Sequence, residues 1–130
     1  MLEWGREYIR EVRVNRPVED AQSLCEDALL QLFRTVPSQP RQPDRFDAWT
    51  ALKDGRASRN RLRFTFSEAD GGTMIRVSTR GASGLWSSVM MPATTRARRS
   101  QVDRLADWLV EEGPGEHLGA WTGDIVWFAG

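Results

Sequence analysis

The sequence predicts an α+β fold in which a mostly antiparallel sheet is covered on one face by two amphipathic helices. Three observations predict it: a helical apolar stripe over residues 18–34, a second stripe over residues 100–112, and a pair of alternating segments around an Asp-Gly-Gly turn between them. The chain has 130 residues, of which 40% are hydrophobic and 28% charged, which is typical of a globular domain. We therefore expect residues 1–130 to form a single domain.

A strand is predicted over residues 6–16, where apolar and charged residues alternate. The apolar residues of one parity are Tyr8, Val12 and Val14. Ile9 breaks the alternation, so we expect both faces of the strand to be partly covered at that point.

The segment that follows predicts a helix over residues 18–34. Pro17 suits its first turn, and acidic residues near its start with Arg34 near its end match the direction of the helix dipole. Its apolar residues recur at the spacing of a single helical stripe and are Ala21, Leu24, Cys25, Ala28, Leu29 and Leu32.

The stretch after this helix has several interpretations. Its three prolines cannot continue the helix. Phe46, Trp49 and Leu52 follow helical spacing and predict a short helix, whereas residues 48–53 fit an edge strand equally well. The sequence leaves helix, strand and loop open for residues 44–58.

A β-hairpin around Asp70-Gly71-Gly72 is the clearest β signal in the sequence. An Asp70-Gly71 turn pairs Phe66 with Ile75 and places all the apolar residues of both strands on one face. A turn centred on Gly71-Gly72 preserves the same parity, so the sequence does not choose between the two. The apolar residues concerned are Leu62, Phe64, Phe66, Ile75, Val77 and Thr79.

A second helix is predicted to end at Gly113, and its start has two candidates. Thr95 could cap it, but Ser100 and Asp103 form a pair that resembles a capping box. Arg98 in a first turn would oppose the helix dipole. We therefore expect this helix to begin near Ser100.

Two further strands complete the predicted order β-α-β-β-β-α-β. One is Leu85–Met91, after a turn at Gly81–Gly84, and the other is Ala120–Phe128, which could fold back at Thr122–Asp124. Two amphipathic helices need a sheet face to cover, so we expect a two-layer sandwich. With one middle strand dropped, the order is that of a ferredoxin-like fold.

Charge and composition argue against several classes of function. The 18 basic and 18 acidic residues give a net charge of zero, which argues against a general nucleic-acid binder. No apolar run approaches the roughly 20 residues that span a bilayer, and the N-terminal residues lack the apolar region of a signal peptide. We expect a cytoplasmic protein without a membrane segment.

Residues for catalysis or metal binding are scarce. Cys25 and His117 are the one cysteine and the one histidine, too few for a zinc site. Cys25 lies on an apolar stripe, where burial raises the pKa of a thiol. We expect His117 in an exposed loop, where a general base would still need a positioned partner. No metal and no cofactor is predicted.

The candidate binding residues are four arginines of the hairpin. Arg61, Arg63, Arg76 and Arg80 share the face opposite the apolar residues. The Asp70-Gly71 turn sets Arg61 against Arg80, a like-charge pair that costs stability and invites an acidic partner. Alternatively, acids of the middle segment or of the C-terminal region neutralise these arginines within the chain, or the face is simply solvated.

Two short stretches carry a family resemblance. Val12–Asp20 runs from a strand into a helix at a proline, and Gly72–Val77 begins a hairpin strand with Gly-Thr. Both resemble the helix-grip superfamily of START and Bet v 1-like ligand-binding proteins. The resemblance implies a cavity between sheet and helix for a small apolar ligand. The predicted strand after the last helix departs from the family, which ends on a long helix.

The first functional hypothesis is a non-enzymatic binding module that engages a partner protein or an acidic ligand through the arginine-rich sheet face. The second hypothesis is a small apolar ligand carrier of the helix-grip type. The third is a small enzyme that uses carboxylates and His117.

Overall fold

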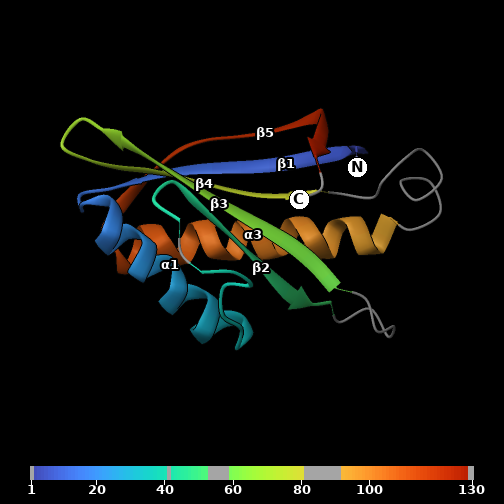
Figure 1. The fold of residues 1–130 in the computed structure, drawn as a ribbon, viewed down its shortest axis with the longest axis horizontal. Helices are drawn as coiled ribbons and strands as arrows, with labels where there is room; N and C mark the ends of the chain where they lie inside the picture. The colour runs from blue at the N-terminus through green and yellow to red at the C-terminus, as the bar shows by residue number, and fades with distance from the viewer. Residues whose placement is uncertain (1, 41, 53–58, 81–91, 129–130) are drawn as a thin grey trace.

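The described residues form a five-stranded antiparallel sheet with two helices packed on one of its faces (Figure 1). This computed structural model describes residues 2–40, 42–52, 59–80 and 92–128. The elements are β1 (Leu2–Val14), α1 (Val18–Phe33), β2 (Arg45–Ala51), β3 (Arg59–Ala69), β4 (Gly72–Arg80), α3 (Pro92–Glu112) and β5 (Gly115–Phe128). The predicted fold class and element order are confirmed.

The strand order β2-β3-β4-β1-β5 interlocks two split β-α-β units. Strands β1 and β3 both run antiparallel to β4, which lies between them, and the connection from β1 to β3 includes α1. Strands β4 and β5 both run antiparallel to β1, and α3 connects them. This is the ferredoxin-like order with β2 added at one edge, and the layering is also consistent with a helix-grip-like fold.

The hairpin register is the one predicted for the Asp70-Gly71 turn. Phe66 pairs with Ile75, and Ala69 with Gly72, so the turn has two central residues. Asp70 and Gly71 have φ angles of 43° and 81°, the positive values of a type I′ turn. The alternative Gly71-Gly72 turn does not form.

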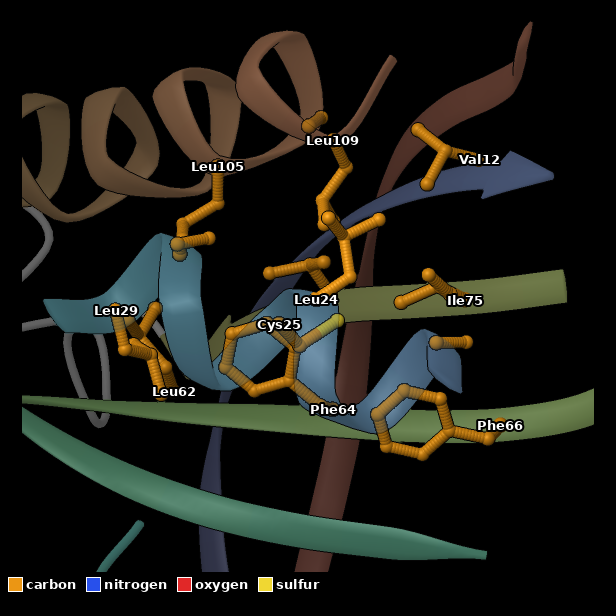
Figure 2. Packing of buried hydrophobic residues seen from close by; sticks show 14 of the residues in the cluster. Val12, Leu24, Cys25, Leu29, Leu62, Phe64, Phe66, Ile75, Leu105 and Leu109 are labelled. Atoms are coloured by element: carbon orange, nitrogen blue, oxygen red, sulfur yellow. The ribbon is translucent and has the colours of Figure 1, made fainter. Parts of the chain in front are cut away.

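The core lies between the helices and the inward residues of the strands. Leu29 of α1 lies beside Leu62 of β3, and Leu24 lies close to Leu109 of α3 (Figure 2). The stripe predicted for residues 18–34 is buried except for Leu32, which is partly buried, and the helix ends at Phe33. Ile9, which breaks the alternation in β1, is buried on the face opposite the helices, so both faces are covered there as predicted.

Strand β2 lies within residues 44–58, which the sequence left open. Residues 45–51 therefore form an edge strand and not a helix. Its inward residues Phe46, Ala48 and Thr50 are buried, and the strand occupies one edge of the sheet. The preceding chain covers the outer edge of β2, because the Ser38 amide donates to the Asp47 carbonyl at 2.8 Å.

Two predicted boundaries in the C-terminal half are wrong. Helix α3 begins at Pro92, about two turns before Ser100. With this start Arg98 lies well beyond the first turn, so the dipole argument against it does not apply, and the Arg98 guanidinium donates to the Arg59 carbonyl at 3.0 Å. Strand β5 begins at Gly115 and runs without folding back, because it pairs with β1 over its whole length. The strand predicted at Leu85–Met91 and its turn at Gly81–Gly84 lie outside the described residues.

Candidate functional site

Asp47 of β2 lies between two of the arginines predicted to bind a partner. It sits opposite Arg63 in the β2–β3 ladder, and its Oδ1 is 2.9 Å from Arg63 Nε. Its Oδ2 is 2.7 Å from Arg61 Nη2. Burial alone would raise the pKa of the Asp47 carboxyl, but hydrogen bonds from Arg63 and Arg61 outweigh it and hold the pKa below its usual value.

The other two predicted arginines lie on β4. Arg76 contacts Glu11 of β1, with 3.3 Å between Arg76 Nη2 and Glu11 Oε2. Arg80 ends the strand and pairs with Glu7 in the β1–β4 register. Asp47 approaches Arg61 and Arg63 from the middle segment, which is one of the alternatives that the sequence left open, whereas the contact of Arg76 with Glu11 of β1 was not foreseen.

An exposed tryptophan lies at the β2 edge of the same face. Trp49 is 40% exposed, and the guanidinium carbon of Arg59 is 4.9 Å from its ring centroid. The guanidinium carbon of Arg61 is 5.9 Å from the same centroid. These distances are those of cation–π contacts. The outer face thus presents an aromatic ring flanked by two positive charges.

A cleft of about 730 Å³ opens between the C-terminal end of α1, the end of β2 and the N-terminal half of α3. Its apolar walls come from both helices and from the end of β2, through Leu32, Phe33, Ala51, Leu52 and Ala97. Its polar walls come from the two helices, through Gln31, Arg34, Ser100, Gln101 and Arg104. The family resemblance implied a cavity between sheet and helix, but the residues that line this cleft could not be read from the sequence.

A buried hydrogen-bond network fixes one wall of this cleft. Gln101 is 7% exposed, and its Oε1 accepts hydrogen bonds from the Thr50 hydroxyl and from Asn60 Nδ2. Its Nε2 donates to the Ala51 carbonyl at 2.9 Å. The Asn60 Oδ1 in turn accepts from Arg98 Nη1 at 3.1 Å. The network ties α3 to β2 and β3, so this wall is formed before any ligand arrives.

A second polar cluster joins α3 to β1 and β5, and it corrects the expectation for His117. His117 lies on β5, not in a loop, and its Nδ1 is 2.9 Å from Arg10 Nη2. A guanidinium only donates, so Nδ1 must accept. Asp103 accepts from Arg10 at 2.8 Å and from the Tyr8 hydroxyl at 2.5 Å. Burial, followed by the hydrogen bond to Asp103, raises the pKa of Tyr8.

Of the two side chains considered for catalysis, His117 lies in this cluster and Cys25 lies in the core. The Nδ1 lone pair of His117 is bonded to Arg10, and its Nε2 is 3.5 Å from Asp107 Oδ1. Cys25 is buried in the core, where desolvation and then the charge of Glu26 raise its pKa well above the usual value. Within the described ranges, no group of three or more His, Cys, Asp or Glu side chains could hold a metal ion.

Comparisons with known proteins give similarity of structure only. No protein-family model and no curated protein matches the chain. The structure is similar to CalU16 from Micromonospora echinospora at a TM-score of 0.49 and 14% identity, covering 86% of this chain and 87% of that one. It is similar to DynU16, a protein in the dynemicin biosynthetic locus, at a TM-score of 0.48 and 15% identity, covering 86% of this chain and 49% of that one.

A third similar structure is Ms6760 from Mycobacterium smegmatis, at a TM-score of 0.43 and 15% identity, covering 82% of this chain and 92% of that one. At these identities a function has to come from the chemistry of the site itself. None of the helices in the described ranges is long and apolar enough to cross a membrane.

Proposed function

We propose that the protein is a cytoplasmic binding module for a small amphipathic molecule, which occupies the cleft between α1, β2 and α3. The cleft volume of about 730 Å³ carries this proposal. Small-molecule sites typically have volumes of about 300–1,000 Å³ and combine apolar walls with a few placed polar groups. The cleft meets both criteria.

The composition of the walls supports an amphipathic ligand. Leu32, Phe33 and Leu52 supply apolar surface from two different elements, so a ligand between them loses contact with water on several sides. Gln101 is held by the buried network and keeps its wall in place without the ligand. A preformed wall lowers the entropy cost of binding.

The proposal is tested with the neutral fluorophore N-phenylnaphthylamine, whose emission rises in an apolar site. We expect the wild-type protein to bind it and Ser100→Trp to bind it about tenfold more weakly or worse, because the indole would fill the cleft. Ser23→Trp is the matched control, since Ser23 is also an exposed serine on a helix but does not line the cleft. Equal affinity of the two variants would contradict the proposal.

A second candidate function is the binding of an acidic partner at the outer sheet face. It is favoured by Trp49, which is exposed and flanked by Arg59. Tryptophan and arginine are the residue types most enriched at the energetic centres of protein interfaces. Arg61, Arg63, Arg76 and Arg80 remain the predicted contributors of positive charge to this face, around Trp49 as a central contact.

Binding of polyglutamate at low salt tests this second candidate. Arg59→Glu should weaken retention more than Arg96→Glu, which makes the same change in net charge at an exposed arginine of α3 that does not line the cleft. Equal weakening by both variants would mean that only the overall charge matters, and the outer face would lose its support.

A further inference from the structure

The charged groups among the described residues that line the cleft are both arginines. Arg34 reaches it from the end of α1 and Arg104 from α3, and no aspartate or glutamate is among the described lining residues. The protein as a whole has equal numbers of acidic and basic residues, so the described lining of the cleft is more positive than the chain average. Charge complementarity therefore points to an anionic group on the ligand.

The backbone at Arg34 is strained. Arg34 caps the C-terminus of α1 in the left-handed conformation, with φ 52° and ψ 43°. Glycine is the usual residue here, because a side chain makes this conformation less favourable. The conformation belongs to the helix cap, because the Arg34 amide donates to the Leu30 carbonyl at 3.1 Å and the Thr35 amide to the Leu29 carbonyl at 3.4 Å. An arginine at this position costs stability and places a guanidinium at the edge of the cleft.

The second arginine is held in place by an aromatic ring. The guanidinium carbon of Arg104 is 5.1 Å from the ring centroid of Phe33, the residue next to Arg34. This cation–π contact connects α3 with the end of α1. Both arginines therefore line the cleft near the end of α1. Arg34 is positioned by its own backbone, and Arg104 by its contact with Phe33.

We propose that the cleft selects a free amphipathic acid, with its anionic group on Arg34 and Arg104 and its apolar body against Leu32 and Leu52. This inference rests on the small-molecule site proposed above. Guanidinium groups bind carboxylates and similar anions through paired, charge-assisted hydrogen bonds. The apolar walls behind them accept the rest of the molecule.

The experiment compares two fluorophores that share one aromatic body: anilinonaphthalene sulfonate, an anion, and neutral N-phenylnaphthylamine. Wild-type protein should bind the sulfonate about tenfold more tightly than the neutral probe. Arg34→Gln and Arg104→Gln should each reduce this ratio several-fold. Arg45→Gln, which removes an exposed arginine outside the cleft, should leave it unchanged.

Arg34→Gly separates a role in binding from a purely structural role, because the two quantities measured should change in opposite directions. It relieves the strain at φ 52°, so we expect its melting temperature to rise while its preference for the sulfonate falls. Binding of the neutral probe with no preference for the sulfonate would overturn the anion inference and leave the cleft proposal standing. Failure of both probes to bind would overturn both proposals. A sulfonate preference unchanged in Arg34→Gly and Arg104→Gln would also overturn the inference.

Discussion

Replacing Asp47 by asparagine should destabilise the protein strongly although the two side chains have nearly the same shape. The carboxylate accepts four hydrogen bonds from the guanidinium groups of Arg61 and Arg63. Its side chain is 11% exposed and those of both arginines are 19% exposed, so water replaces few of these bonds. Asparagine keeps one acceptor oxygen and turns an NH₂ group toward a guanidinium.

The expected loss in the free energy of unfolding is about 3 kcal/mol, the lower end of the cost of breaking a buried ion pair. For a chain of this size, that corresponds to a fall in melting temperature of about 10 °C. Urea denaturation and calorimetry measure both. The matched control is Asp44→Asn, because Asp44 is an exposed aspartate just before β2, and we expect its effect to stay within about 0.5 kcal/mol. Similar losses in both variants would refute the reasoning.

Acidification provides a second test of the same contact. The pKa of the Asp47 carboxyl is lowered in the folded protein. Its contribution to the free energy of unfolding is therefore fully present above the unfolded-state pKa of about 3.9. It is lost as the pH falls through the folded-state pKa. The difference in free energy of unfolding between wild type and Asp47→Asn should therefore shrink below about pH 4. A difference that stays constant into the acid range would contradict the lowered pKa.

Two further predictions concern the interior. Gln101→Leu should cost about 2–4 kcal/mol in urea denaturation, because it leaves buried groups of Thr50, Asn60 and Ala51 without their partner; a loss below about 1 kcal/mol would show that the network rearranges easily. Cys25 should react with a disulfide reagent only after unfolding, since it is fully buried and its pKa is raised, and rapid reaction of the native protein would contradict this burial.

Local sequence patterns were sufficient to predict α1 and the β3–β4 hairpin, because in both the apolar residues of the pattern are the ones buried in the fold. The apolar stripe from Ala21 to Leu32 predicts a helix with one face toward the core, and α1 packs in this way. The Asp70-Gly71 turn and the parity of Phe66 and Ile75 carry their own register, because a slip of one residue would expose every apolar side chain. Both features depend on residues that are close in the sequence.

The elements that were misplaced depend on contacts between distant residues. The N-terminal half of α3, which begins at Pro92, is joined to β3 by Arg98, which bonds to Arg59 some forty residues earlier in the chain. His117 belongs to a strand because β5 pairs with β1, at the opposite end of the sequence. In the stretch that contains β2, Phe46, Trp49 and Leu52 fit helical spacing while residues 48–53 fit a strand, so the pattern did not decide between helix and strand.

The sequence by itself determined the fold class, the hairpin register and the scarcity of residues for catalysis, whereas strand β2 lies in a stretch that it left open. It also placed Arg61, Arg63 and Arg76 on one face of the hairpin. Only the tertiary structure decided that Asp47 and Glu11 approach these arginines and that Arg34 and Arg104 line one cleft. The physical reason is that charge pairing and cleft walls join side chains from different elements, and their spacing in the sequence carries no record of which elements will meet.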